Sequence, residues 1–275
     1  MEFQIWKPNG IKFLRRQISY YKKMANIIYF SESKKVSMAN SWFEVATLEH
    51  FWVKRRFEVL RKLLGRGFQP LGPVAEVGCG HGLVQAQFRK TYGVPVDGYE
   101  LNEFALSLSV AKDQPRYIYD IYERREELKG KYSVMIMFDV IEHIEDEKGF
   151  LDAVLFHLAP GGQLVVNVPA LEWLRSRYDD EQGHFRRYTL QQIEDLGAEC
   201  DLSRVKSTYW SLPMVPLLLL RKAILKFQKG ERAIVKTGFA PPSNLANSIL
   251  CWLSALEFIP QRLLGTSAMC VFKKT

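Results

Sequence analysis

The chain has 275 residues, of which 47% are hydrophobic and 25% charged, with a net charge of +8, a composition ordinary for a globular protein of one large domain or two small ones. Its four cysteines show no CxxC spacing and its five histidines form no HExxH or HxH pair, so we expect neither a disulfide framework nor a metal site. The N-terminal stretch lacks an apolar run followed by a cleavage site, which disfavours a secretory signal and predicts a cytoplasmic location.

Residues 40–64 predict one long amphipathic helix. Apolar residues recur there at helical spacing, and Pro70 and Pro73 end the pattern before the first strand. We therefore predict an N-terminal helical extension or lid over residues 1–70 and a catalytic domain over residues 71–275.

From residue 74 onward, strand and helix patterns alternate. Short apolar runs predict strands at 74–78, 95–100, 116–120, 132–139 and 162–168. Helical patterns lie between most of them, at 83–92, 102–112 and 147–158. With two later strands at 204–210 and 267–273, the alternation predicts an α/β fold: a Rossmann-like, doubly wound, mostly parallel seven-stranded sheet with helices on both faces. Such sheets bind ligands at the carboxyl ends of their strands.

Two apolar segments, 212–227 and 244–264, precede the last strand and predict a helical insertion over residues 211–264. Arg221 and Lys222 interrupt the first segment, and Asn247, Glu257 and Pro260 interrupt the second, so neither is a good transmembrane span. The segments fit either a lid over the sheet or helices that lie on a membrane surface.

The charge is unevenly distributed along the chain. Lys and Arg outnumber Asp and Glu by 14 to 5 in residues 1–70 and by 11 to 2 in residues 203–275, whereas residues 71–202 hold 13 against 23. Basic flanks suggest an anionic partner such as a membrane surface, a phosphorylated substrate or nucleic acid. Neutralisation of the acidic centre by the flanks is the alternative.

The stretch VAEVGCGHGLV (74–84) ends a predicted strand in three closely spaced glycines and runs into a helix. This arrangement brings backbone N–H groups and a helix N-terminus to a ligand. Dinucleotide-binding proteins use GxGxxG, but Leu83 occupies the place of the third glycine of that motif. An acid at the end of the second strand, Glu100, is suited to the hydroxyls of a ribose, a need that NAD and adenosylmethionine share.

The stretch EVGCGHG resembles the first motif of class I S-adenosylmethionine-dependent methyltransferases. The resemblance implies that the methionine end of the cofactor binds at this turn, and it assigns the ribose to Glu100 and the adenine to Asp120 and Ile121. A helix cap is the other interpretation of Asp120. The residues assigned to the cofactor here are Glu76, Gly78, Cys79, Gly80, His81, Gly82, Glu100, Leu101, Asp120 and Ile121.

The stretch MFDVIEHIED (137–146) resembles the (F/L)xxxEH(I/V) loop of small-molecule and lipid-quinone methyltransferases. The resemblance implies that Phe138, Asp139 and Val140 lie along the cofactor and that His143 faces the methyl group and the acceptor. A histidine on a short turn also fits a packed structural role.

Three further stretches, EHFWVKRR (49–56), PALEWL (169–174) and GHFRRYT (183–189), resemble a subgroup of bacterial methyltransferases whose relatives often act on cell-surface glycans or lipids. They add His184 as a second catalytic candidate, and they suggest an acceptor site formed by Trp52, Arg55, Arg187 and Tyr188. The expected reaction is O- or N-methylation of a small-molecule, glycan or lipid-linked acceptor. A peripheral position at the inner face of a membrane stays open beside the cytoplasmic location.

Two other functions stay open. One is an NAD(P)-binding oxidoreductase or epimerase, which would require a glycine at position 83 and a YxxxK pair near the fourth or fifth strand, and the sequence has neither. The other is a non-catalytic adenosylmethionine-binding protein. Methylation of nucleic-acid bases is disfavoured, because no NPPY or DPPY motif follows the fourth strand of the predicted domain.

Overall fold

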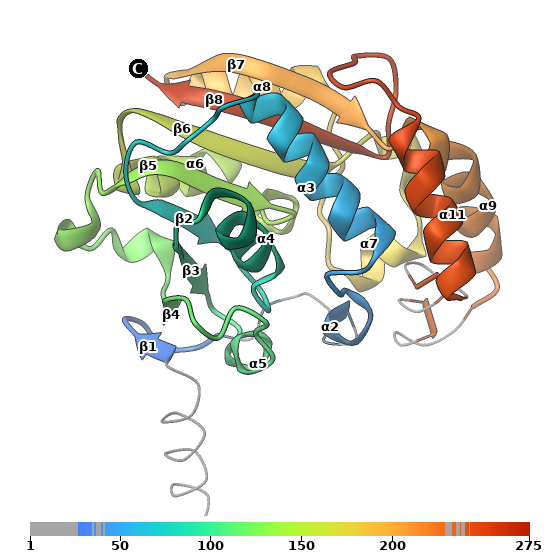
Figure 1. Cartoon of the computed structure of the whole chain (residues 1–275), viewed down its shortest axis with the longest axis horizontal. Coiled ribbons are helices and arrows are strands. Elements are labelled where there is room, and N and C mark those ends of the chain that lie inside the picture. Colours follow the sequence, from blue (N-terminus) through green and yellow to red (C-terminus); the bar gives the residue numbers. More distant parts are fainter. Residues whose placement is uncertain are drawn as a thin grey trace, which may run out of the picture.

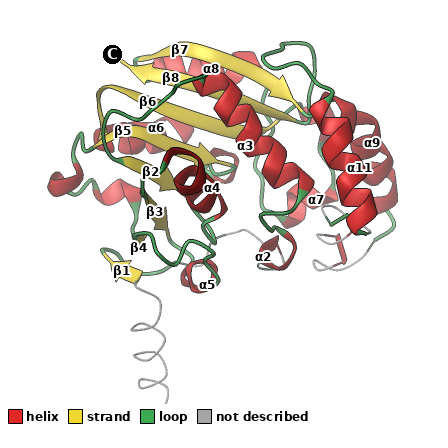
Figure 2. Ribbon diagram, viewed as in Figure 1, coloured by secondary structure: helices red, strands yellow, loops and turns green. Residues whose placement is uncertain are grey.

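The computed structural model describes residues 27–34, 36, 40, 42–228, 233, 234, 237, 240, 241 and 243–275, and residues 1–26 of the N-terminal extension predicted over residues 1–70 lie outside them. The described residues form one eight-stranded sheet in the order β1-β4-β3-β2-β5-β6-β8-β7, with helices on both faces (Figures 1 and 2). The predicted α/β fold class is therefore confirmed.

The strands agree closely with the sequence patterns. They are β1 (Ile27–Tyr29), β2 (Val74–Val77), β3 (Val96–Glu100), β4 (Arg116–Ile118), β5 (Tyr132–Phe138), β6 (Leu158–Pro169), β7 (Leu202–Trp210) and β8 (Ser267–Lys274). Strands β1 to β6 pair in parallel, and β8 lies antiparallel between β6 and β7. The edge strand β1 was not predicted and extends the expected seven strands to eight.

The helices are α2 (Trp42–Val45), α3 (Phe51–Leu64), α4 (Leu83–Tyr92), α5 (Glu103–Ser107), α6 (Glu147–His157), α7 (Arg177–Glu181), α8 (Leu190–Glu199), α9 (Val215–Leu225) and α11 (Asn244–Ala255). Short 3₁₀ helices are η1 (Ile121–Glu123), η2 (Glu126–Leu128), η3 (Ile141–His143), η4 (Glu172–Leu174) and η5 (Leu212–Met214).

The single helix predicted over residues 40–64 is wrong, because the chain turns between α2 and α3. The carbonyl of Ala46, just after α2, is hydrogen-bonded to Nε2 of His81 at 2.7 Å. His50 then caps α3, its Nδ1 accepting from the backbone N–H of Trp52 at 3.2 Å. The pattern at 102–112 was also too long, since the helix there ends at Ser107 and the N–H of Val110 bonds the carbonyl of His81 at 2.9 Å.

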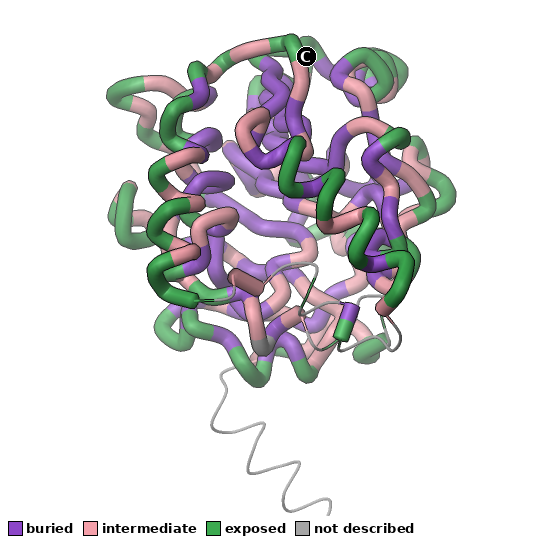
Figure 3. The backbone as a smooth tube through the Cα atoms, turned by 90° about the vertical axis from the view of Figure 1, so that its right-hand side faces the viewer, coloured by how far each residue is buried: buried purple, intermediate pink, exposed green. Residues whose placement is uncertain are grey.

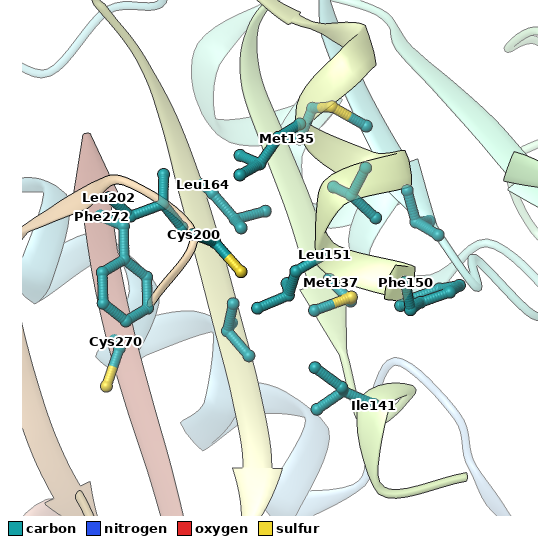
Figure 4. Close-up of a cluster of buried hydrophobic side chains, with 14 of the residues drawn as sticks. Met135, Met137, Ile141, Phe150, Leu151, Leu164, Cys200, Leu202, Cys270 and Phe272 are labelled. Carbon is teal, nitrogen blue, oxygen red and sulfur yellow. The ribbon is translucent and has the colours of Figure 1, made fainter. Parts of the chain in front are cut away.

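The sheet has a separate apolar core on each face, which fits its buried strands (Figure 3). On one face α6 and α8 cover the sheet, and Figure 4 shows Phe150 and Leu151 of α6 close to Met137 of β5. On the other face α3 and α4 pack through residues such as Leu60 and Phe88. Because both faces are covered, a ligand site is expected at the ends of the strands.

The segment before the last strand forms α9 and α11, which stand together beside the carboxyl ends of the parallel strands (Figure 1). Helix α11 packs against α3, and Arg55 of α3 donates to the backbone carbonyl of Glu257 at 3.1 Å. Among the helices of the described residues, none has the length and apolar character needed to cross a bilayer.

Candidate active site at the carboxyl ends of the strands

A first cavity, of about 340 Å³, lies at the carboxyl ends of β2, β3 and β5. Its volume is within the range of small-molecule and cofactor sites, which begins at about 300 Å³. Of the residues assigned to the cofactor from the sequence, the structure brings all but Gly82 to its wall: Glu76, Gly78, Cys79, Gly80, His81, Glu100, Leu101, Asp120, Ile121, Phe138, Asp139 and Val140.

Gly78 and Gly82 of the turn are explained by different structural constraints. Gly78 has φ +69°, and a Cβ on it would lie 2.4 Å from Cγ2 of Val140, so a side chain would collide with the loop after β5. Gly82 has φ +80° and caps α4, and a Cβ there would lie 2.7 Å from Oγ of Ser109. Gly82 therefore allows the turn to pack closely against Ser109, whereas Gly78 lines the first cavity.

Glu100 holds the turn from the end of β3. Its Oε2 accepts from the N–H of Gly80 at 2.9 Å, and its Oε1 accepts from the N–H groups of Leu101 and Asn102 at 2.8 and 2.9 Å. Burial raises the pKa of Glu100, although these three backbone donors act in the opposite direction. Each carboxylate oxygen has a further lone pair, so Glu100 can organise the turn and still accept from a ligand.

Asp120 is a helix cap and also lines the cavity. Its Oδ1 accepts from the N–H of Tyr122 at 3.1 Å at the start of η1, and its Oδ2 pairs with Lys34. The helix-cap interpretation therefore holds, and the capping carboxylate is also part of the cavity wall, so the contact with the adenine stays a prediction.

Glu76 is an acid buried in the wall of the first cavity. Burial raises its pKa to about 8, and the positive charge of Arg56 acts against this shift. Within the described residues, its Oε2 has no hydrogen-bond partner. A buried carboxylate oxygen without a donor is unfavourable, so this atom would gain from a cationic or N–H group in the cavity.

Asp139 lines the first cavity and contacts residues of both the sheet and α3. It has φ +56°, an uncommon conformation for a residue with a side chain, and its carboxylate pairs with Arg56. Its Oδ1 accepts from Nδ2 of Asn167 at 2.8 Å, and Oδ1 of Asn167 accepts from Nε1 of Trp210 at 2.8 Å. The guanidinium of Arg56 also lies 4.5 Å from the ring centre of Trp52. This network holds the Arg56–Asp139 pair in place at the cavity wall.

A second cavity, of about 240 Å³, adjoins the first, and Trp42 and Asp139 line both. Helices α9 and α11 supply part of its wall. Other lining residues come from the loops after β5 and β6 and from α3; the set includes Trp52, Glu142, Tyr178, His184, Arg187, Met214, Leu217, Leu218, Arg221 and Leu250.

The two candidate catalytic histidines lie side by side, although they are far apart in the sequence. The rings of His143 and His184 have centroids 4.9 Å apart and cross nearly at right angles. His143 lines the first cavity and His184 the second. Burial lowers the pKa of His143 to about 3, so its imidazole is neutral at physiological pH.

The family of the chain follows from comparison with known proteins. A family model described as a methyltransferase domain matches residues 48–207, more than half of the chain. The chain belongs to this methyltransferase family. A search of curated protein sequences gave no match.

Solved methyltransferases share the fold. Phosphoethanolamine N-methyltransferase 2 of Haemonchus contortus, solved with S-adenosyl-L-methionine, is 17% identical with a TM-score of 0.53, over 82% of this chain and 56% of that one. The chain thus matches little more than half of that enzyme. Geranyl diphosphate C-methyltransferase of Streptomyces coelicolor A3(2), solved with Mg²⁺, geranyl diphosphate and S-adenosyl-L-homocysteine, is 11% identical with a TM-score of 0.53, over 81% and 77%. At these identities the likeness establishes the class I methyltransferase fold alone.

Two residues assigned to the acceptor from the sequence lie outside both cavities of this methyltransferase. Arg55 is buried between Glu58 and Glu257 and ties α3 to the end of α11. Tyr188 is also buried, and its hydroxyl donates to Oε1 of Glu147 at 2.6 Å. Trp52 and Arg187 do line the second cavity.

Several wall residues were not assigned from the sequence. Trp42 and Phe43 of α2 and Lys34 line the first cavity, and so does Arg56, whereas the sequence predicted its neighbour Arg55 at the acceptor site. The amphipathic pattern of the helix was the available signal for Arg56, but it does not tell which of two adjacent arginines faces the strand ends. Asn167 had no local signal, because its role depends on a partner from β7.

Proposed function

We propose that the protein is an S-adenosylmethionine-dependent methyltransferase that binds the cofactor in the first cavity and an acceptor in the second. The observation that carries the proposal is the junction of the two cavities at Trp42 and Asp139, beside the glycine turn. A methyl donor and its acceptor must meet in line and in a dry place, and two adjoining cavities supply that geometry.

The residues of the first cavity fit the cofactor. Oε2 of Glu76, buried and without a donor in the described chain, suits the α-amino group, and the N-terminal end of α4 suits the carboxylate. Glu100 offers acceptor lone pairs to the ribose hydroxyls, and Asp120 and Ile121 flank the place of the adenine.

S-adenosylmethionine supplies an activated methyl group, so the main task of the chain is to position the acceptor and exclude water. His143 and His184, on the adjoining walls, are the candidate catalytic residues. An amine acceptor needs little beyond a close approach in its neutral form, whereas a hydroxyl acceptor gains from a nearby group that takes its proton.

The second cavity favours an acceptor with an apolar part and an anionic group. Trp52, Met214 and Leu218 give an apolar wall, and Arg187 and Arg221 give positive charge. Arginine binds carboxylate and phosphate groups in a bidentate manner. A small molecule, a glycan or a lipid-linked molecule of this kind is the proposed class of acceptor.

Calorimetry with S-adenosylmethionine and S-adenosylhomocysteine tests the cofactor site. We expect both to bind the wild type, and we expect Glu100→Ala to weaken binding about 100-fold, since a charge-assisted hydrogen bond contributes about 1.5–3 kcal/mol. Glu126→Ala, at an exposed acid outside the cavity, is the control. Absence of binding by the wild type, or equal affinities in the two variants, would refute the assignment.

A pair of substitutions on α9 tests the acceptor site. Leu217 lines the second cavity and Leu219 does not, although the two are about equally exposed, at 44% and 43%. We expect Leu217→Trp to fill part of the cavity and lower methyl transfer to an acceptor, with cofactor affinity unchanged. Leu219→Trp should retain both methyl transfer and cofactor affinity. Equal turnover in the two variants would place the acceptor outside the second cavity.

We further propose that α9 and α11 rest on an anionic membrane surface. Exposed apolar side chains concentrate on these helices and just beyond their C-terminal ends, among them Leu220, Phe227, Leu245, Trp252 and Phe258. The surrounding region from residue 203 on has 11 basic residues and 2 acidic ones. Apolar side chains beside basic ones are typical of surfaces that lie in a lipid interface.

Co-sedimentation with vesicles tests this surface. We expect binding to vesicles that contain phosphatidylserine and much weaker binding to pure phosphatidylcholine. Trp252→Ser together with Phe258→Ser should reduce it, whereas Leu71→Ser, at a fully exposed leucine before β2, should not. Equal sedimentation of all three proteins would exclude these helices as the contact.

A further inference from the structure

Three side chains of metal-binding types, one carboxylate and two imidazoles, meet at the boundary of the two cavities. Glu142 and His143 lie on η3, and His184 follows α7 about 40 residues later; one ligand atom from each lies within 4.8 Å of the others. Sequence spacing gave no sign of this group, because its members come from separate loops. The expectation that the histidines form no metal site therefore rested on local motifs alone.

Hydrogen bonds to backbone carbonyls hold η3 against the segment that follows α7. The N–H of Phe185 donates to the carbonyl of Glu142 at 2.8 Å, and the N–H of His184 donates to the carbonyl of Asp179 at 2.9 Å. The guanidinium of Arg186 donates to the carbonyl of Ile144 at 2.9 Å. The three side chains are thus held together by the fold before any ligand arrives.

The supporting contacts are those of metal-binding histidines. Nδ1 of His184 donates to Oδ1 of Asp179 at 3.0 Å, and this fixes the tautomer whose Nε2 carries a lone pair. Asp179 is completely buried and is held in turn by Nε of Arg187 at 2.8 Å. The ring of His143 has a hydrogen bond with the backbone of Gly183. The hydrogen bond from His184 to the carboxylate of Asp179 orients the ring of His184 and makes it a better metal ligand.

Glu142 supplies an independent observation. Its side chain is completely buried, and neither of its carboxylate oxygens has a hydrogen-bond partner among the residues that the structure describes. A buried carboxylate is strongly unfavourable unless a proton or a cation compensates its charge. The negative charges of Asp139 and Asp179 lie near enough to increase this cost.

We propose that Glu142, His143 and His184 bind one divalent transition-metal ion. Two imidazoles and one carboxylate favour Zn²⁺, Co²⁺, Ni²⁺ or Fe²⁺ over Mg²⁺ and Ca²⁺, which prefer oxygen ligands. Three protein ligands leave coordination positions open, as in catalytic rather than structural zinc sites. Because Glu142 and His184 line the second cavity, an oxygen of the acceptor could occupy one of these positions.

The metal site and the proposed function can be tested separately, because metal binding is measured without cofactor or acceptor. Untagged full-length protein is treated with a chelator, dialysed and titrated with ZnCl₂ by calorimetry. We expect one ion per chain, and we expect CoCl₂ to give visible absorption bands of a nitrogen-ligated ion. MgCl₂ should neither bind at this site nor displace Co²⁺.

Matched variants locate the ion. Glu142→Gln and His184→Ala should abolish stoichiometric binding, whereas Glu145→Gln, at an exposed acid three residues along the same loop, should bind Zn²⁺ as the wild type does. Asp179→Asn, a positioning variant, should lower affinity about 10- to 100-fold. Binding of S-adenosylhomocysteine and the melting temperature report whether each variant is folded.

Three results would overturn the proposal. The wild type binds no Zn²⁺; it binds Zn²⁺ equally well with Glu142 or His184 replaced; or the Co²⁺ protein lacks the bands of nitrogen ligation. The first result would assign a proton rather than a metal to Glu142. The wild-type titration and the Co²⁺ spectrum can still overturn the proposal if a variant unfolds.

Discussion

The two cavities of this methyltransferase differ in how the chain builds them. The first is formed mainly by residues at or just beyond the carboxyl ends of neighbouring parallel strands, such as Glu76, Glu100 and Asp139. The second is formed by side chains from α3, η3, the segment around α7, α9 and α11, which the sequence separates widely. The wall of the first cavity therefore follows from the sheet itself, whereas the wall of the second depends on how the surrounding elements pack.

The strongest test of this difference between the two cavities compares Arg56→Met with Arg55→Met. The two arginines are adjacent and buried, and each is paired with a carboxylate, Asp139 for the former and Glu257 for the latter. Removing one partner of a buried pair costs about 3–5 kcal/mol, so both variants should lose stability to a similar extent in urea unfolding.

Only Arg56→Met should also weaken S-adenosylmethionine in calorimetry, because Arg56 lines the first cavity and Arg55 lines neither. Arg56→Met combined with Asp139→Asn should recover part of the stability, since the unpaired buried charge is gone. Equal cofactor affinities in the two single variants would contradict the assigned wall.

Gly78→Ala should cost about 3 kcal/mol of folding free energy, the sum of a left-handed backbone and a collision. Its new Cβ would lie 2.4 Å from Cγ2 of Val140. Gly67→Ala is the matched control, since Gly67 has φ +76° with no atom within 4 Å of its Cβ position. We expect the control to lose only about 1 kcal/mol and to keep cofactor binding.

Urea unfolding and calorimetry on both glycine variants measure these effects, and adding Val140→Ala to Gly78→Ala should restore part of the loss. If Gly78→Ala bound the cofactor normally, the close approach of the turn to the loop after β5 would not matter to the site.

Much of the fold and of the first cavity could be predicted from the sequence, because the signals are local. The helix pattern at 83–92 matches α4 residue for residue, and the strand pattern at 74–78 matches β2 to within one residue. An acid at the carboxyl end of a parallel strand lies at the ligand-binding edge of the sheet, which is how Glu100 could be assigned, whereas Asp120 was assigned from the resemblance to class I methyltransferases.

The remainder could not be predicted, because it depends on contacts between distant segments. Nε2 of His81 is hydrogen-bonded to the carbonyl of Ala46, and the backbone carbonyl of His81 accepts from the N–H of Val110. These contacts lie where two helices end although their apolar patterns continue in the sequence. Adjacent arginines at 55 and 56 carry the same charge, and only tertiary packing gives each its partner. For β1, the short apolar run at 27–30 is the only local signal in the sequence.

Cofactor binding should release a proton from Glu76. The pKa of this acid is raised to about 8, so it is protonated in the free protein below that pH, and a ligand ammonium beside it favours the carboxylate. Affinity should therefore rise with pH, by up to about tenfold per pH unit between pH 6 and pH 7.5. Calorimetry in buffers of different ionisation enthalpy counts the proton.

Glu76→Gln supplies the control, since its affinity should stay constant over the same range. The raised pKa has a second consequence for the free protein. As pH rises from 4.5, the ordinary pKa of this acid, to about 8, the unfolded chain loses the proton first and the folded state loses stability. A wild type whose affinity does not change with pH would exclude contact between Glu76 and the ligand ammonium.

The smallest expected effect separates the two roles of Asp120. Serine caps helices as well as aspartate does, so Asp120→Ser should keep η1 and the melting temperature, while its shorter side chain withdraws from the first cavity. The lost pair with Lys34 contributes little, because the lysine side chain is 59% exposed. Calorimetry should then show a loss of about threefold in cofactor affinity, less than 1 kcal/mol. Asp120→Ala removes the cap as well and should also lower the melting temperature. If Asp120→Ser binds as the wild type does, Asp120 acts only through the cap, and the adenine end of the first cavity depends on Ile121 and its apolar neighbours.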